Sequence, residues 1–141
     1  MVQVQADTLK VELCAPERNP VRLDASELIL PGSQGVFTVL PGHTTLLSTL
    51  TTGVVQAQCV DGETKFFAVN GGFAEVNQDR VIVLTLTAEA DGEVDVERAE
   101  AARERAEQRL QERGDDVDLD RAQAALERAL ARLMTQRHQG Y

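Results

Sequence analysis

Two arginines near the end of the chain, Arg128 and Arg132, lie one helical turn apart in a stretch rich in Ala, Leu and Glu. Neither has an acidic residue three or four positions away, where a helix would bring one alongside. The pair therefore needs a carboxylate from elsewhere in the fold, an anionic ligand, or simply water and salt. Two guanidinium forks on one helix face match the oxygens of a phosphate group well.

A second charged group precedes this pair. Asp95, Arg98 and Arg105 are separated by three and seven residues, which places them on roughly one face of a helix. One interpretation is a solvated charged face with a local ion pair between Asp95 and Arg98, and spacing alone favours it. The sharper hypothesis is a phosphate and purine site shared by two helices. The residues by themselves leave both open.

Few other side chains in the sequence are suited to catalysis. His43 and His138 lie in different halves of the chain, and no Cys or His cluster has the spacing of a metal site. No Gly-x-x-x-x-Gly-Lys loop is present to hold phosphates, so we do not expect the chain to hydrolyse ATP by itself. We predict no catalytic residues and no metal ligands, and we expect Cys14 and Cys59 to be reduced thiols.

Composition narrows the class of partner. The 141 residues include 23 acidic and 14 basic side chains, a net charge of -9 that would repel nucleic acid. No apolar run is long enough to cross a bilayer, and the first residues lack the pattern of a signal peptide. We therefore expect no nucleic-acid partner, and membrane association only through another protein.

The first part of the chain shows the two-residue periodicity of β-strands, with many β-branched residues. Residues 9–13 and 81–87 show it clearly, and residues 54–60 and 64–69 are further predicted strands. Asp61-Gly62 predicts a hairpin, and further turns are expected at residues 70–72 and 77–79. Short strands at such close spacing are typical of a sandwich or a flattened barrel.

After a hinge at Asp91-Gly92, helix formers dominate. We expect one helix to begin at Asp95 and end near Gly114, and a second to begin with Asp116 or Asp118 as its cap. Apolar residues recur at helical spacing in both segments: Ala99, Ala102, Ala106 and Leu110, then Leu119, Ala122, Leu126, Ala129 and Leu133. The short loop predicts an antiparallel hairpin. Because its seam is mostly alanine, at about 0.8 kcal/mol per buried methyl, the hairpin could detach and extend.

The domain prediction is residues 1–88 for the β-sandwich and 89–141 for the helical hairpin. Several segments carry a family resemblance: residues 15–18 (Ala-Pro-Glu-Arg), 31–35, 39–47 and 70–76 in the strand half, and residues 94–99 (Val-Asp-Val-Glu-Arg-Ala) and 118–133 in the tail. With these segments, the whole chain resembles the epsilon subunit of bacterial F-type ATP synthase, the counterpart of the mitochondrial delta subunit.

The resemblance implies a mixed fold, a ten-stranded β-sandwich followed by a C-terminal antiparallel two-helix hairpin. It implies a non-catalytic rotor subunit that forms the central stalk with the gamma subunit, lies against the c-ring, and helps couple proton flow to ATP synthesis. The expected location is peripheral, on the cytoplasmic face of the bacterial inner membrane. In many members the helices swing out to reach the alpha/beta hexamer and block ATP hydrolysis.

No cofactor is implied as a requirement, but in some members ATP, with or without Mg, binds the folded hairpin as a regulatory ligand. The corresponding positions here are Glu89, Asp95, Arg98, Arg105, Arg128 and Arg132, and every residue type matches. In that arrangement the arginines would meet the phosphates. Glu89 and Asp95 would contact the base or ribose, or orient Arg98.

Two features depart from the family pattern. The loop expected to face the c-ring, Ser33, Gln34, Gly35 and Val36, has Val36 where many relatives carry a carboxylate. In addition, residues 89–141 hold 14 acidic and 9 basic side chains, whereas inhibition by an extended tail relies on basic residues. We therefore rank the coupling role above inhibition. The alternative from another class is a free-standing nucleotide-sensing adaptor, in which the sandwich is only a scaffold.

Overall fold

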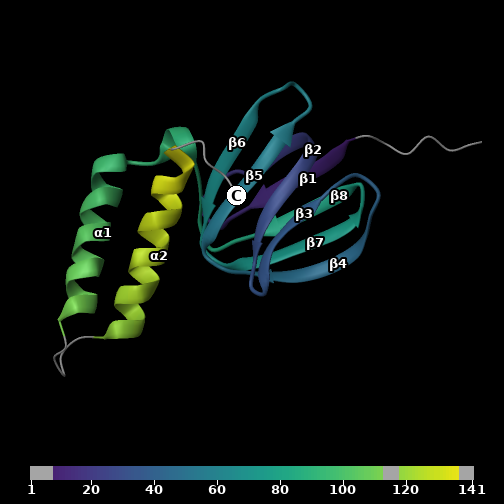
Figure 1. The fold of residues 1–141 in the computed structure, drawn as a ribbon. Coiled ribbons are helices and arrows are strands. Elements are labelled where there is room, and N and C mark those ends of the chain that lie inside the picture. Colours follow the sequence, from purple (N-terminus) through teal and green to yellow (C-terminus); the bar gives the residue numbers. More distant parts are fainter. Residues whose placement is uncertain (1–7, 113–117, 137–141) are drawn as a thin grey trace, which may run out of the picture.

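The computed structural model describes residues 8–112 and 118–136, which form a β-sandwich with a helical hairpin at its side (Figure 1). The strands in these residues are β1 (Leu9–Cys14), β2 (Val21–Gly32), β3 (Gly35–Val39), β4 (His43–Leu50), β5 (Gly53–Cys59), β6 (Thr64–Val69), β7 (Gly72–Gln78), β8 (Arg80–Leu84) and β9 (Ala88–Ala90). A short 3₁₀ turn, η1 (Asp91–Glu93), leads to α1 (Val96–Gln111) and α2 (Leu119–Gln136). The predicted order of a β domain followed by two helices is confirmed.

The strands are hydrogen-bonded in the order β1-β8-β7-β4-β2-β5-β6-β9, with β3 also paired to β2. Strand β2 serves both layers, because its first half pairs with β1 and its second half with β3 and β5. A register shift between Ala25 and Glu27 marks the change. The described residues therefore contain nine strands where the resemblance implied ten, and dividing β2 at this irregularity would give the tenth.

The main core lies between the two layers and is built by alternation along the strands. In β8, Val81 and Val83 are buried while Ile82 and Leu84 are exposed, as the two-residue period predicts. The largest fully buried side chains are Leu9, Leu13, Leu28, Leu30, Val39, Val54, Val55, Val76, Val81, Val83 and Thr135. The sandwich is held by this apolar interior, since both cysteines, Cys14 and Cys59, are free thiols as expected.

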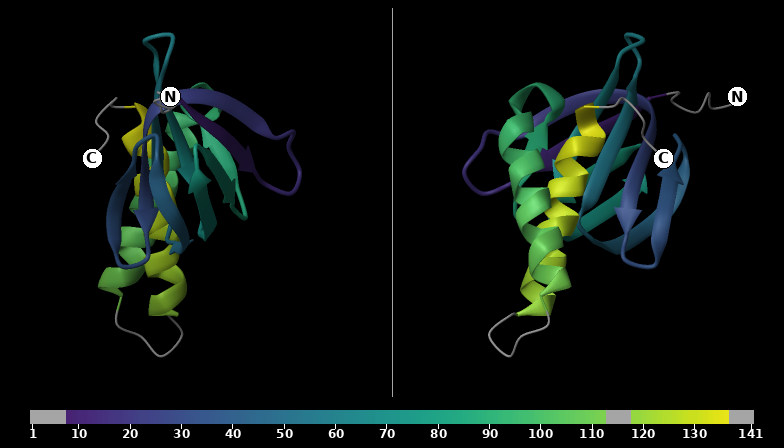
Figure 2. Two further views of the ribbon diagram at one scale, coloured as in Figure 1. Left: turned by 90° about the vertical axis from the view of Figure 1, so that its right-hand side faces the viewer. Right: turned by 60° about the vertical axis from the view of Figure 1, so that its left-hand side comes forward.

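A second, smaller core joins the hairpin to the sandwich. Val54 of β5 and Phe66 and Ala68 of β6 point to the outer face of the sheet, where Ala131 of α2 is buried against them and Met134 packs at the edge. Figure 2 shows α2 between α1 and the sandwich. The hairpin is therefore held by more than its alanine seam, because α2 buries one face against α1 and another against the sheet.

The helix starts are set by local capping, as predicted. The Asp95 carboxylate accepts a hydrogen bond of 3.1 Å from the backbone N–H of Arg98, and the Asp118 carboxylate accepts one of 3.0 Å from the N–H of Arg121. Helix α1 ends at Gln111, and the predicted end at Gly114 and the alternative cap Asp116 lie outside the described residues. The division of domains between residues 88 and 89 stays a prediction.

The predicted turns also fall where expected. Gly62 lies in the β5–β6 hairpin with a φ of 95°. Gly72, at the start of β7, has a φ of 115°, and a Cβ there would lie 1.8 Å from the carbonyl oxygen of Leu84. Among the described helices, none combines the length and apolar character needed to span a membrane.

Candidate functional site

Four of the six predicted nucleotide-site residues line one open pocket of about 250 Å³ between the sandwich edge and the hairpin: Glu89, Asp95, Arg98 and Arg132, together with Glu93 and Ala99. The chain reaches this pocket twice, first along residues 89–99 and again at Arg132. Strand β9 and η1 supply the two glutamates, the start of α1 supplies Asp95 and Arg98, and the end of α2 returns Arg132 to the same place. The antiparallel hairpin is what brings the two ends of the helical segment together.

The Arg132 guanidinium is bound by a carboxylate of the sandwich. Its Nη2 lies 2.9 Å and its Nε 3.1 Å from Oε1 of Glu89, and both side chains are about one-third exposed, at 34% and 30%. Of the three partners considered for this arginine, the structure thus shows a carboxylate from elsewhere in the fold. Glu89 contacts Arg132 directly, so it joins α2 to β9.

Asp95 and Arg98 interact differently from the predicted side-chain ion pair. The carboxylate of Asp95 caps α1 by accepting from the backbone N–H of Arg98, and the structure records no ion pair between the two side chains. Within residues 8–112 and 118–136, the Arg98 guanidinium has no hydrogen-bond or ion-pair partner. It is therefore the cation of this pocket that is available to an anion.

The other two predicted residues lie outside the pocket. Arg128 is half-buried beside Glu89 and Arg132, in an adjoining crevice also lined by Asn70. Arg105 is exposed on α1, two turns beyond Arg98. The charge of Arg128 can thus contribute at short range, whereas Arg105 could reach only a ligand that extends along the helix.

Glu93 is a charged residue of this pocket that the sequence analysis did not predict as part of the site. It lies two residues before the helix cap, so the sequence alone places it close to Asp95. Nothing in the sequence indicates that it also shares a pocket with Arg132. Its carboxylate is bound by Arg18, from the loop between β1 and β2, in a pair of hydrogen bonds of 3.0 and 3.1 Å. The two residues are separated by 75 positions, which no local pattern reports.

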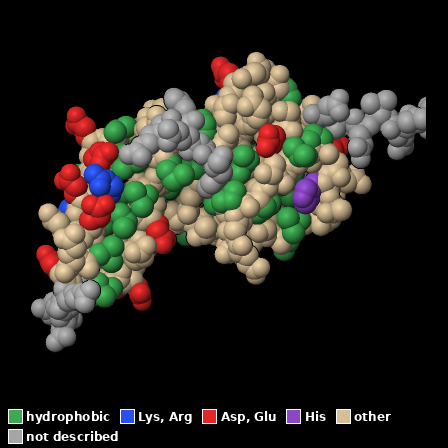
Figure 3. Space-filling view, in the orientation of Figure 1, with side chains coloured by type: hydrophobic (Ala, Val, Ile, Leu, Met, Phe, Trp, Pro, Cys, Tyr) green, Lys and Arg blue, Asp and Glu red, His purple; other side chains and the backbone are tan. Residues whose placement is uncertain are grey.

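The acidic side chains gather over the helical part of the molecule in the view of Figure 3. Part of this charge is neutralised within α1, where Glu100 and Glu107 both bond the Arg103 guanidinium and raise its pKa. Within the described part of the chain, no group of three or more His, Cys, Asp or Glu side chains could hold a metal ion. His43, predicted to lie in a loop, is the first residue of β4, where its ring contacts the carbonyl of its neighbour Thr44, 2.7 Å away.

A second candidate surface is the outer face of the sheet formed by β4, β7 and β8. Phe73 of β7 and Leu84 of β8 are direct cross-strand partners, and Leu47 and Ile82 flank Glu75 in the next row. The exposed fractions are 71% for Leu47, 52% for Phe73 and 51% for Leu84. We call Leu47, Phe73, Ile82 and Leu84 the apolar face. Contiguous exposed apolar side chains of this kind mark an interaction surface.

The predicted c-ring loop forms one end of the same side of the molecule. Ser33 and Gln34 make the two-residue turn between β2 and β3, and Gly35 has a φ of 130°. Val36 is 49% exposed, and a surface groove connects it to Leu47 of the apolar face. The loop therefore presents an apolar contact in place of a carboxylate.

The described residues therefore form a two-part protein, a β-sandwich with a docked helical hairpin, whose apolar sheet face is suited to contact another protein. Family profiles give the particular assignment: residues 8–91 match the ATP synthase, Delta/Epsilon chain, beta-sandwich domain, and residues 93–135 match the long alpha-helix domain of the same chain. The chain belongs to the ATP synthase delta/epsilon family, whose members are non-catalytic subunits of that complex.

Individual relatives agree with this assignment. The ATP synthase epsilon chain of Moorella thermoacetica is 47% identical over 75% of this chain and 79% of its own, and that of Koribacter versatilis is 42% identical over 77% and 76%. A chain in the cryo-EM structure of the Euglena gracilis mitochondrial ATP synthase has the same fold, with a TM-score of 0.82 and 22% identity over 96% of this chain and 85% of that one.

Proposed function

We propose that the chain is a rotor subunit of the central stalk of a proton-translocating ATP synthase. In this role it binds the gamma subunit and the c-ring, and it helps couple proton flow to ATP synthesis. The observation that carries the proposal is the apolar face, because four large side chains exposed on one sheet surface need a partner. Family membership makes the stalk the natural partner.

The position of the apolar face supports simultaneous contact with two partners. Phe73 and Leu84 pair across β7 and β8 at one end of these strands and offer an apolar surface to a protein such as gamma. Val36 lies at the loop end of the same side and offers a smaller apolar contact to the c-ring. The expected location, peripheral on the cytoplasmic face of the inner membrane, follows from these contacts, since membrane association then runs through the partners.

Binding to isolated gamma subunit tests the stalk proposal. The double substitution Phe73→Ser, Leu84→Ser removes a cross-strand apolar pair from the apolar face and should weaken binding by more than about tenfold. Leu130→Ser is the matched control, because Leu130 is also exposed, at 42%, but lies on α2. Equal affinity of the double variant and the wild type would contradict the proposal.

A regulatory role for the hairpin is a second candidate, and the pocket at its base favours it. Four predicted nucleotide-site residues meet there, and among the described residues the Arg98 guanidinium has no hydrogen-bond or ion-pair partner. ATP, accompanied by Mg, would place its phosphates against Arg98 and the Arg128–Arg132 side. A ligand that binds only the docked hairpin stabilises that conformation by its differential affinity. The hairpin would then report nucleotide level to the stalk.

The test is a calorimetric titration of the full chain with MgATP, beside the double variant Arg128→Ala, Arg132→Ala. Saturable binding that the variant loses would establish a nucleotide-gated hairpin. Absence of binding at millimolar ATP would leave the charged residues as structural contacts and the protein as a coupling element alone. Inhibition of hydrolysis by contact with the alpha/beta hexamer ranks below both roles, because the hairpin is strongly acidic.

A further inference from the structure

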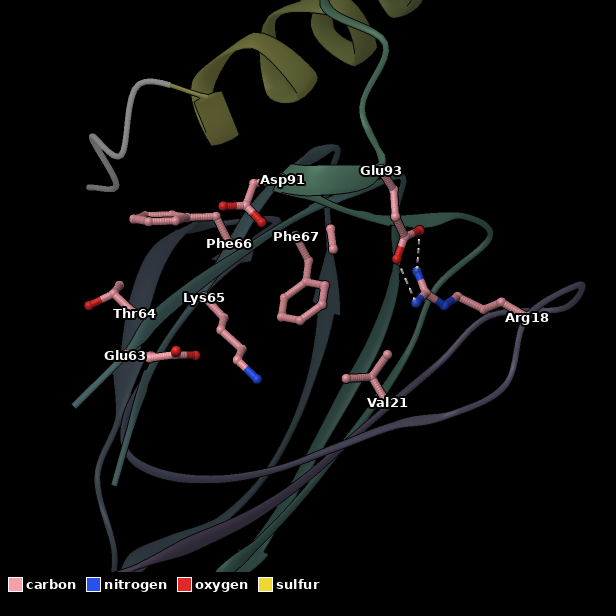
Figure 4. A pocket seen from close by; sticks show the side chains of 10 residues that line it. Arg18, Val21, Glu63, Thr64, Lys65, Phe66, Phe67, Asp91 and Glu93 are labelled. Atoms are coloured by element: carbon pink, nitrogen blue, oxygen red, sulfur yellow. Dashed lines mark hydrogen bonds and ion pairs between the residues drawn. The ribbon is translucent and has the colours of Figure 1, made fainter. Parts of the chain in front are cut away.

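Glu93 lines two neighbouring pockets. On one side it lines the candidate nucleotide pocket with Asp95, Arg98 and Arg132. On the other it lines a larger pocket of about 490 Å³, which also contains Arg18 and Phe67 (Figure 4). Its carboxylate is therefore placed to affect the electrostatic potential on both sides.

Arg18 holds this carboxylate from the sandwich side. The two guanidinium nitrogens meet the two carboxylate oxygens at 3.0 and 3.1 Å, and Nη1 also donates a 2.7 Å hydrogen bond to the backbone carbonyl of Ala88. The Arg18 side chain is only 24% exposed, whereas Glu93 is 50% exposed. Arg18 is thus the anchored partner, and its link to β9 fixes the position of Glu93.

The formal charges around the nucleotide pocket show why the contact between Arg18 and Glu93 affects ligand binding. Three carboxylates, Glu89, Glu93 and Asp95, face two guanidiniums, Arg98 and Arg132, so the lining alone carries one net negative charge. A nucleotide triphosphate is strongly anionic and would be repelled by such a lining. Arg128, in the adjoining crevice, brings the set to neutrality, and Arg18, which does not line the pocket, adds the positive charge that makes the surroundings net cationic.

We infer that Arg18 is a positioning residue for this pocket: it ties Glu93 to the sandwich and neutralises its charge, which leaves Arg98 free to meet an anion. The inference rests on the proposed nucleotide function. In the absence of Arg18, Glu93 would be unpaired in the pocket that it shares with Arg98 and would compete with the ligand for that guanidinium. Arg18 thereby couples the β1–β2 loop of the sandwich to a ligand bound at the hairpin.

Titration of the full chain with MgATP tests this role. Arg18→Ala should raise the dissociation constant about tenfold, because it leaves one uncompensated negative charge beside the ligand. Adding Glu93→Gln to Arg18→Ala should restore the constant to within about twofold of wild type, since the charge that Arg18 neutralised is then gone. Arg22→Ala is the control, because Arg22 is exposed in the sandwich and lines neither pocket.

The outcomes separate the two hypotheses. If the wild type binds and Arg18→Ala binds equally well, or if Glu93→Gln fails to rescue it, the positioning role is wrong and the nucleotide site stands. If the wild type does not bind MgATP, the nucleotide function fails and the inference fails with it. Should Arg18→Ala not fold, Glu93→Gln alone decides: binding at least as tight as wild type supports the role, and clearly weaker binding makes Glu93 a ligand contact instead.

Discussion

Breaking the ion pair between Arg132 and Glu89 should loosen the hairpin from the sandwich, because this pair directly joins α2 to β9. The contact is a guanidinium fork with distances of 2.9 and 3.1 Å to Oε1. Both side chains are about one-third exposed, so solvent screens the pair more than a buried one. We therefore expect a coupling of about 1 kcal/mol, at the upper end for partly exposed pairs.

A double-mutant cycle with Glu89→Gln, Arg132→Gln and both together isolates this coupling. The measurement is hydrogen exchange of the backbone amides of residues 126–135 in the full chain under native conditions, which reports how often α2 opens. A coupling of about 1 kcal/mol corresponds to about a fivefold change in the opening equilibrium. The effect should shrink as salt is added, since screening weakens the pair.

Arg103→Gln is the matched control for the cycle. It removes an arginine that is also held by carboxylates, but its partners Glu100 and Glu107 are both on α1, so no contact with the sandwich is lost. This variant should leave the docking of α2 on β5 and β6 unchanged. A coupling between residues 89 and 132 below about 0.3 kcal/mol would show that the pair does not hold the hairpin.

Three further predictions concern packing and protonation. Phe66→Ala should destabilise the docked hairpin by about 3 kcal/mol, because it empties the small core beneath α2, and the same exchange experiment would show faster opening there without collapse of the sandwich. Gly72→Ala should prevent or severely weaken folding, whereas Gly62→Ala, which also has a positive φ but meets no atom within 4 Å, should cost only about 1 kcal/mol in chemical denaturation. Burial raises the pKa of the Cys14 and Cys59 thiols, so the stability they contribute is intact below their unfolded pKa and lost as the pH rises through the folded one. The urea midpoint should fall as the pH rises above about 8.5, the ordinary pKa of a thiol, and it should fall less in a variant lacking both thiols; equal slopes in the two proteins would contradict a contribution from the thiols.

The features predicted best from the sequence are those fixed by local physics. The sequence predicts Asp95 as one cap and Asp116 or Asp118 as the other, because a carboxylate just before a helix satisfies a nearby backbone N–H, and Asp95 and Asp118 both make that bond. The Asp61-Gly62 hairpin was found for the same kind of reason, since a glycine takes the positive φ of the turn. These signals lie within a few residues of each other.

Contacts between distant segments were not predicted. The docking of α2 on the sheet joins Ala131 to Phe66, and the only sign of it was that residues 66–69 are continuously apolar, which is typical of a strand buried on both faces. The partner of Arg132 is Glu89, 43 residues away, and neither neighbourhood indicates the other. Family resemblance placed both in one site but did not reveal that they bind each other.

The most direct test of the central claim is to purify the tagged chain from cells that express it at its natural level, from solubilised membranes and from the cytosolic fraction separately. A central-stalk subunit should be recovered from the membranes together with the other ATP synthase subunits, in constant proportion to them, and the Phe73→Ser, Leu84→Ser variant should lose this association. Recovery of the wild type alone, from the cytosolic fraction, would contradict the account and favour a free-standing nucleotide sensor.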